Sequence, residues 1–253
     1  MAEQSNKEDK LILSRAEDAV DFAENKYQIK AVGFLNPHKR TLISRNICNA
    51  YGCKCVFDGG YPDAERTMFV CCPEYDEYDI DDIVSVIEIT GRELGRLSHR
   101  DYLGSLMGLG ITRENIGDIL VFDSGAFIFV RGEIADYIVQ NLNKIGRNGI
   151  NTKVVKCSQA KIPEPKYKEL QGTVPSERLD AIVAFVAGTS RGKACELIEK
   201  GLVCVNWEVT DNVSAKVCEG DLLSVRGVGR SRIRKFGGLT RKGRLGIIAD
   251  KFE

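Results

Sequence analysis

The sequence lacks several patterns that mark well-known classes of protein. No apolar run approaches the roughly 20 residues that a membrane-spanning helix needs. The polar start, MAEQSNKEDK, has no apolar segment of the kind found in a signal peptide. No GxGxxG follows a strand pattern, and the glycine-rich stretch LMGLGITRENIGD has no P-loop lysine. We therefore expect a cytoplasmic protein with no membrane contact and no nucleotide cofactor or other small-molecule substrate.

Metal-ligating residues do not occur in the spacing that metal sites require. The 253 residues contain nine cysteines but no CxxC pair, and only His38 and His99 could supply imidazole. Zinc sites usually draw closely spaced Cys or His pairs from two places in the chain. Several of the cysteines lie in apolar runs, where cysteine acts as a small buried hydrophobe. We expect reduced structural thiols and no metal.

The chain as a whole has no net charge, but its two parts carry opposite net charges. The 36 basic and 36 acidic side chains balance, yet residues 174–253 carry a net +4 and residues 1–173 a net −4. The segment from Arg226 to Arg244 holds eight Lys or Arg and no Asp or Glu. Such asymmetry indicates nucleic-acid contact by the C-terminal part, although two solvated faces of opposite charge would give the same counts.

Helix and strand patterns mix without strict alternation over the first 160 residues, which favours an α+β domain. We expect a helical extension over 1–35 and then an RRM-like or similar mixed domain up to residue 160. Proline and lysine over residues 161–173 indicate a linker. The expected helices cover 8–29, 38–52, 97–111 and 133–146, and the expected strands cover 53–61, 66–72, 81–89, 117–130 (a hairpin) and 151–157.

A second, smaller domain is expected over residues 174–253. Two helices, starting near Pro175 and at Ser190, precede strands at 202–209 and 222–226 and a basic hairpin that turns at Gly237 and Gly238. A strand would place Arg230, Arg232 and Arg234 on one face.

The motifs of this domain resemble those of the S4 RNA-binding domain, with its αL motif. RLDAIV, SRGKACELIEKGLVCVN and VCEGDLLSVRG follow one another in the order typical of that domain. Upstream, FLNPHKRTLI, FDGGYPDAERTMF, LSHRDYLGSLMGLGITRENIGDILV and EIADYIVQNLNKIGR resemble the N-terminal domain of YlmH-type bacterial S4 proteins. Trp207 stands where most S4 domains have glycine and is also typical of that group.

The resemblance implies an RNA-binding, ribosome-associated protein without catalysis. The S4 domain would dock on ribosomal RNA of the large subunit in the presence of stalled peptidyl-tRNA, and would assist quality control. Arginine and lysine attract phosphates, and arginine can grip two oxygens at once. We expect RNA contacts at Arg178, Ser190, Arg191, Lys193, Lys200, Asn206, Arg226, Arg230, Arg232, Arg234, Lys235, Arg241, Lys242 and Arg244.

Alternative roles remain open for some of these residues. Arg178 could pair with Asp180 or Glu177, and Lys200 could simply favour a helix C-terminus. In the motif SHRD, Ser98 and Asp101 fit a capping box better than a catalytic group. A second RNA contact could involve His99, Arg100 and Arg113.

Two other functions are considered for the whole chain. An RNA-modifying enzyme could use S4 as a targeting module, but the only Arg-Leu-Asp lies inside S4 itself, and no methyltransferase loop is evident. A scaffold linked to the ribosome or to cell division could bind a protein through the acidic domain. The acidic stretch Asp76–Asp82 is assigned no role, and we expect a monomer.

Overall fold

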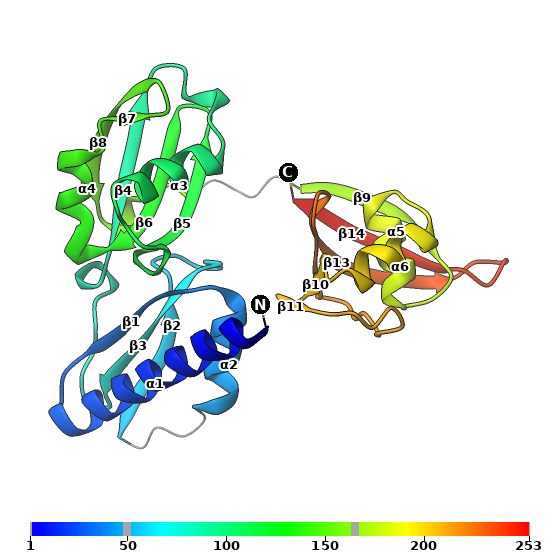
Figure 1. The fold of residues 1–253 in the computed structure, drawn as a ribbon, viewed down its shortest axis with the longest axis horizontal. Coiled ribbons are helices and arrows are strands. Elements are labelled where there is room, and N and C mark those ends of the chain that lie inside the picture. Colours follow the sequence, from blue (N-terminus) through cyan, green and yellow to red (C-terminus); the bar gives the residue numbers. More distant parts are fainter. Residues whose placement is uncertain (1, 48–51, 163–166, 253) are drawn as a thin grey trace. The chain divides into compact units, whose positions relative to one another are not determined.

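The computed structural model describes residues 2–47, 52–162 and 167–252 and divides the chain into two compact units, Met1–Pro163 and Glu164–Glu253 (Figure 1). Both units combine helices with antiparallel strands, which confirms the α+β class. Within the described part of the chain, none of the helices combines the length and apolar character that crossing a membrane would require.

The first half of the N-terminal unit is a three-stranded sheet with two helices packed against it. Its sheet order is β1-β3-β2. The apolar stripe expected on the first helix is buried at Ile12, Ala16, Ala19 and Ala23, against residues of β1 and β3. The elements are α1 (Ala2–Lys26), β1 (Lys30–Leu35), α2 (Pro37–Asn46), β2 (Cys53–Asp58) and β3 (Thr67–Pro73).

The helical extension expected over 1–35 is wrong beyond Lys26. Tyr27 adopts a left-handed φ of 55°, which ends the helix. The following residues form β1, whose Val32 and Phe34 are buried while Lys30 is exposed. This alternation marks a strand.

The second half of the unit is a five-stranded sheet in the order β5-β6-β4-β8-β7, with two helices on one face (Figure 1). Its strands and helices are β4 (Val84–Gly91), α3 (His99–Gly108), β5 (Ile116–Phe122), β6 (Gly125–Arg131), α4 (Ala135–Asn141), β7 (Lys144–Ile145) and β8 (Asn148–Val155). Short 3-10 helices are Ile80–Asp82, Leu94–Arg96, Arg113–Asn115, Gly132–Ile134 and Cys157–Gln159.

Strand β3 is buried along its whole length because apolar residues cover both of its faces. Phe69 and Cys71 belong to the cluster under α1. Met68 and Val70 belong to another cluster that includes Phe129 of the second sheet. The continuous apolar run of this strand therefore joins the two halves of the unit.

The helix expected over 133–146 is shorter in the structure. It ends at Asn141, and Lys144–Ile145 forms β7, which pairs with the start of β8. Gly146, expected as a helix stop, has a φ of 59° and lies in the turn between these strands. Leu142 and Ile145 are buried in the same cluster as Ile138. Their apolar spacing is that of a helix, but they reach the core from residues that follow the helix.

The acidic stretch also contributes to this unit. Asp81 Oδ1 accepts a hydrogen bond of 2.7 Å from the backbone N–H of Cys157, which follows β8. One carboxylate of the stretch therefore anchors the end of the sheet.

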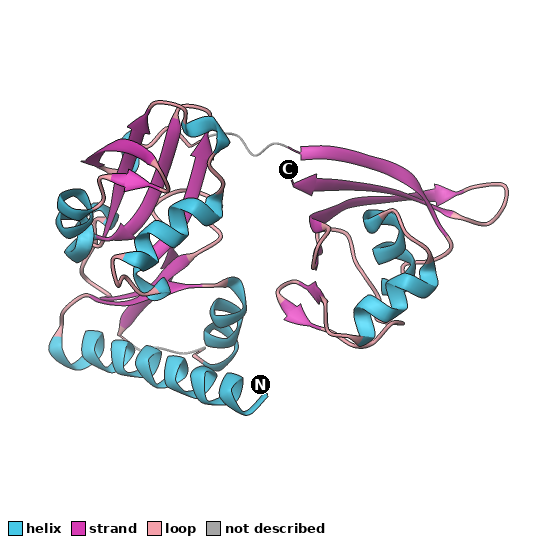
Figure 2. Cartoon of the chain, turned by 45° about the horizontal axis from the view of Figure 1, so that its top comes forward, coloured by secondary structure: helices cyan, strands magenta, loops and turns pink. Residues whose placement is uncertain are grey.

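The C-terminal unit is a six-stranded antiparallel sheet in the order β11-β10-β12-β13-β14-β9, with both helices on one face (Figure 2). Leu179, Val183 and Ile198 of the helices pack on Leu223 and Ile233 of the sheet. The elements are β9 (Tyr167–Val174), α5 (Leu179–Ala187), α6 (Arg191–Glu199), β10 (Val203–Val205), β11 (Glu208–Val209), β12 (Leu222–Val225), β13 (Gly229–Leu239) and β14 (Leu245–Phe252).

The linker expected over 161–173 is wrong in its second part, because that part forms β9. This strand pairs with β14 over its full length, from Tyr167 opposite Phe252 to Val174 opposite Leu245. Gly172 allows it to pack closely, since a Cβ there would lie 2.6 Å from the ring of Phe185. The linker prediction for residues 163–166 concerns a segment outside the described part of the chain.

The start of one helix and the position of one turn also differ from expectation. The first helix of this unit starts at Leu179 rather than near Pro175, although it ends as expected before Gly188. The hairpin turns at Thr240–Gly243 rather than at Gly237 and Gly238, because β13 continues to Leu239.

Candidate nucleic-acid interface

A buried carboxylate links the starts of the two helices of the C-terminal unit. Asp180 Oδ1 lies 3.2 Å from Arg178 Nε, and its Oδ2 lies 2.5 Å from Arg191 Nη2. The backbone N–H of Ala181 also donates to Oδ1, at 2.9 Å. The aspartate side chain is 5% exposed, whereas Arg178 and Arg191 are 44% and 51% exposed. Asp180 thus holds two partly exposed guanidinium groups in place.

The pKa of this carboxyl is set by two opposing effects. Burial of Asp180 raises its pKa, but hydrogen bonds and positive charge from Arg178 and Arg191 outweigh burial and hold the pKa below its usual value. The carboxylate is therefore ionised at neutral pH, and the three groups together carry a net positive charge. The alternative that Arg178 pairs with Asp180 is confirmed, and the pairing leaves further guanidinium donors available.

The first turn of α6 adds backbone donors next to this cluster. Ser190 Oγ caps the helix by accepting from the N–H of Lys193, at 3.3 Å. Arg191 and Lys193 are both exposed, and the turn contains no acidic residue. A helix N-terminus of this composition favours a bound anion such as a phosphate.

Lys200 lies at the other end of the same helix. It is the C-cap residue, and its Nζ is 3.5 Å from Glu196 Oε2. The alternative of a helix-stabilising role is therefore present in the structure. At 65% exposure the ammonium group also remains open to solvent.

The basic strand β13 places its arginines on one face, as expected. Ser231 and Ile233 are buried in the domain, while Arg232 and Arg234 are exposed and Arg230 is half-buried. Arg234 differs from the others because it binds two carboxylates, those of Asp250 and Glu169.

The remaining basic residues of the hairpin region lie at the surface. Arg244 donates to Thr173 through Nε at 2.9 Å and through Nη2 at 2.6 Å, and so ties the hairpin to β9. The other members of the expected set are exposed: Arg226, Lys235, Arg241 and Lys242.

Asn206 has a role that the sequence did not reveal. Its Nδ2 donates to Asp221 Oδ1 at 2.7 Å, and its Oδ1 accepts from the N–H of Leu222 at 2.9 Å. Asp221 in turn accepts from the N–H of Cys218 through Oδ2, at 2.7 Å. The asparagine of the Val-Asn motif and the aspartate of the Gly-Asp motif therefore hold one another in place. Asn206 is exposed, so its RNA contact stays a prediction.

The capping box expected at the start of α3 is confirmed. Asp101 Oδ2 accepts from the backbone N–H of Ser98 at 2.7 Å and from its hydroxyl at 2.8 Å. These bonds lower the pKa of Asp101. His99 and Arg100 are exposed on this first turn.

Arg113 is half-buried, and its guanidinium group is engaged by backbone carbonyls. Its Nη1 donates to the carbonyl oxygens of Ile116 and Gly117, both at 3.1 Å. Burial lowers the pKa of Arg113. Together with Arg66, which donates to the Arg113 carbonyl at 3.0 Å, it fixes the loop before β5. Arg113 therefore has a structural role, and its RNA contact stays a prediction.

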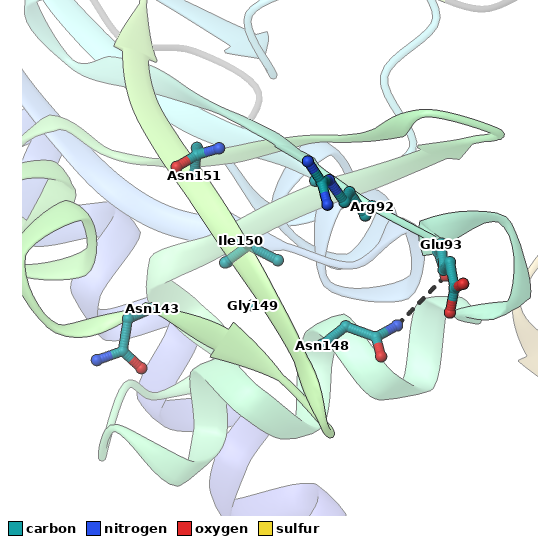
Figure 3. A pocket seen from close by; sticks show the side chains of 8 residues that line it. Arg92, Glu93, Asn143, Asn148, Gly149, Ile150 and Asn151 are labelled. Atoms are coloured by element: carbon teal, nitrogen blue, oxygen red, sulfur yellow. Dashed lines mark hydrogen bonds between the residues drawn. The ribbon is translucent and has the colours of Figure 1, made fainter.

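An open pocket of about 570 Å³ on the five-stranded sheet was not expected from the sequence (Figure 3). Arg92, Asn143 and Asn151 line it, and Asn148 Nδ2 donates to the carbonyl of Glu93 at 3.3 Å. Asn148 and Asn151 both lie on β8, whereas Arg92 follows β4, so the fold brings the arginine to these amides.

The thiols of the N-terminal unit lie close together on neighbouring strands. Cys55 is opposite Cys71 in the register of β2 and β3, and their sulfur atoms are 2.9 Å apart. The cysteines of the described residues are all free, and no group of three or more His, Cys, Asp or Glu among those residues could hold a metal ion.

Comparison with known proteins identifies both units. Residues 73–159 match the family described as "Putative RNA-binding domain in YlmH", and residues 177–223 match the S4 domain. The chain is 31% identical over 248 residues to the ribosome-associated protein quality control protein P2 of Bacillus subtilis, covering 97% of this chain and 96% of that protein. The solved structure of the cell division protein ylmH from Streptococcus pneumoniae matches with 25% identity and a TM-score of 0.53, over 62% of this chain and 95% of that one. The chain therefore belongs to the YlmH-type family of S4-domain RNA-binding proteins.

Proposed function

We propose that this chain is a non-catalytic protein that docks through its S4 domain on ribosomal RNA of the large subunit. There it assists the clearance of stalled peptidyl-tRNA complexes, as a monomer in the cytoplasm. The printed name of the Bacillus subtilis relative, a ribosome-associated quality control protein, supports this proposal.

The observation that carries the proposal is the pair of arginines held by Asp180. A flexible arginine loses side-chain entropy when it binds a phosphate. Here the carboxylate has already ordered Arg178 and Arg191, which lie 2.5–3.2 Å from its oxygens. Most of the side-chain entropy of the two arginines is therefore lost on folding, and less is lost when RNA binds.

The phosphate-binding surface extends from this pair to the start of α6. Arg191 and Lys193 supply charge, and the capped first turn supplies backbone N–H groups. Lys200, Arg226, Lys235, Arg241 and Lys242 form an exposed basic rim. Arg234 and Arg244 mainly hold strands together, because their guanidinium groups are bound within the domain.

Sedimentation with purified large subunits at rising salt concentration tests the proposal. A phosphate-led interface is tightest at low salt, and its log affinity falls linearly with log salt concentration. We expect association at low salt that is lost progressively as salt is added. An absence of association at the lowest salt concentration would contradict the proposal.

The proposed lack of catalysis has a separate test. Ribosomal RNA from a deletion strain can be examined by mass spectrometry for a missing modified nucleoside. We expect an unchanged set of modifications. A modification that is lost on deletion and restored by the purified protein would instead indicate an RNA-modifying enzyme.

A further inference from the structure

The sheet of the C-terminal unit has a second face, opposite the one that α5 and α6 cover (Figure 2). Three neighbouring strands align Cys204, Ser224 and Arg230 in register across this face. Farther along, Phe252 of β14 lies opposite Tyr167 of β9. This helix-free face thus carries polar, basic and aromatic side chains, and no helix of the unit covers it.

Aromatic rings and a guanidinium group form a continuous row on the helix-free face. The Arg230 guanidinium lies 5.5 Å from the ring centroid of Trp207 and 5.2 Å from that of Phe252. The Phe252 ring meets the Tyr167 ring edge-on, with centroids 5.0 Å apart. Arg232 lies 5.9 Å from Phe252 as well. Rings and guanidinium planes in such a row offer stacking surfaces to flat ligands.

The backbone at Trp207 is held in a conformation that suits glycine. Asn206 and Trp207, with φ values of 48° and 73°, form the two-residue connection between Val205 and Glu208. Asparagine tolerates this region, but a large aromatic residue is strained there. Strain that persists in a folded protein often marks a functional position. Trp207 is half-buried in this turn, so part of its ring stays accessible.

A pocket of about 400 Å³ adjoins this tryptophan. Trp207, Leu202, Cys204, Arg226 and Arg230 contribute to its lining. Its volume lies within the range of pockets that bind small molecules. Ser224 also lines it, and the Ser224 hydroxyl is buried without a hydrogen-bond partner among the described residues.

The charge of the helix-free face favours an anionic ligand. Arg232 is exposed, and its guanidinium group lies on the Phe252 ring. On the same face, Arg234 binds the carboxylates of Asp250 and Glu169. A polymer with phosphates and planar bases can bind the arginines through its phosphates and stack its bases on the aromatic rings. An acidic peptide can bind only the arginines.

We propose that the helix-free face binds single-stranded RNA, with one unpaired base held in the pocket beside Trp207. This site adjoins the basic rim at Arg226 but is distinct from the arginine pair held by Asp180 at the helix starts. It therefore goes beyond the docking proposed above, and either one can hold without the other.

The sequence provides a direct probe, because Trp207 is the single tryptophan of the chain. The full chain would be titrated with decauridylate and decaadenylate, with a ten-base-pair RNA duplex, and with a decamer of glutamate. We expect saturable quenching of tryptophan emission by the single strands and at least fivefold weaker binding of the duplex. Absence of quenching by single strands, equal binding of the duplex, or preferred binding of the peptide would each overturn the proposal.

Variants then locate the site. The double variant Phe252→Leu, Tyr167→Leu should weaken single-strand binding at least fivefold, and the single variant Trp207→Gly should do the same. Binding of each variant is measured by the fluorescence anisotropy of a labelled decauridylate. The control Leu239→Ala changes a side chain that is 74% exposed elsewhere on β13 and should leave binding unchanged. Unaltered affinity in the folded aromatic variants would contradict the assignment.

A further variant separates this proposal from the docking proposal. Arg191→Gln with Lys193→Gln should retain quenching by single strands even if it no longer sediments with large subunits. Loss of both properties in this variant would mean that one surface serves both and would overturn a separate site.

Discussion

The Asp180 carboxylate lies 2.5 Å from Nη2 of Arg191, a residue of the next helix, and 3.2 Å from Nε of Arg178. One buried acidic group thereby fixes the geometry of two partly exposed basic groups. The Arg-Leu-Asp and Ser-Arg motifs, eleven residues apart between Asp180 and Arg191, meet at this contact. The aspartate of the first motif thus orients the arginines of both motifs for phosphate binding.

Asp180→Asn should destabilise the C-terminal unit. The change removes charge-assisted hydrogen bonds but leaves the arginines in contact with solvent, so we expect a loss of about 1–3 kcal/mol in the free energy of unfolding. Urea denaturation of the full chain measures it. Identical unfolding midpoints for the two proteins would show that the carboxylate does not hold the helices.

The same carboxylate predicts a pH dependence. Its pKa in the folded protein lies below the unfolded value of 3.8, so its stabilising contribution is full above that value and is lost as pH falls through the folded pKa. The stability difference between the wild type and Asp180→Asn should therefore be constant from pH 7 to about pH 5 and should shrink below about pH 4. A difference that grows as the solution is acidified would contradict this sign.

Gly172→Ala should also destabilise the C-terminal unit. The added Cβ would lie 2.6 Å from the ring of Phe185, so the strand or the ring must shift, at a cost of about 1–3 kcal/mol. The second change Phe185→Leu should recover part of the loss. The matched control is Gly192→Ala, where a Cβ meets open space, and it should be neutral or stabilising. Equal effects of the two alanines on the thermal midpoint would refute this packing argument.

Asn206 tests the distinction between a shaping residue and an RNA contact. Asn206→Gly keeps the left-handed backbone accessible but removes the bonds to Asp221 and Leu222, so we expect a loss of about 1–2 kcal/mol in unfolding free energy. RNA affinity of the folded fraction should stay within twofold of the wild type. A large loss of affinity without loss of stability would instead support the RNA contact expected at Asn206.

Features set by nearby residues were predictable from the sequence. The Ser98–Asp101 capping box spans three residues, and the alternation of Arg230, Ser231 and Arg232 follows from the two-residue period of a strand. The end of α5 before Gly188 follows from the left-handed conformation that glycine adopts there, with a φ of 61°.

Features set by distant partners were not predictable. The sequence indicates a linker where β9 lies, because the strand that pairs with it, β14, begins more than 70 residues later. The bond between Asn206 and Asp221 is not visible in the sequence, because the two residues are 15 positions apart. Arg113 likewise turns inward to carbonyls that the sequence does not place. In each case tertiary contacts supply the partner.

The structure also changes how the basic strand should be tested. Reversing Arg230, Arg232 and Arg234 together, as the sequence alone would suggest, also places a glutamate beside Asp250 and Glu169. Repulsion among three carboxylates would disturb the sheet, so loss of binding in that variant would not report on RNA contact. Neutral substitutions at the start of α6 avoid this problem, because Arg191→Gln places no new carboxylate beside Asp180, the residue that Arg191 binds.

The most direct test of the account is sedimentation of Arg191→Gln, Lys193→Gln protein with large ribosomal subunits at low salt. Its matched control, Lys7→Gln with Lys10→Gln, makes the same change in charge at exposed positions of α1. The account predicts at least tenfold weaker association for the α6 variant and association within twofold of the wild type for the control, with both proteins folded by circular dichroism. Equal association of the two variants would contradict docking through the S4 domain.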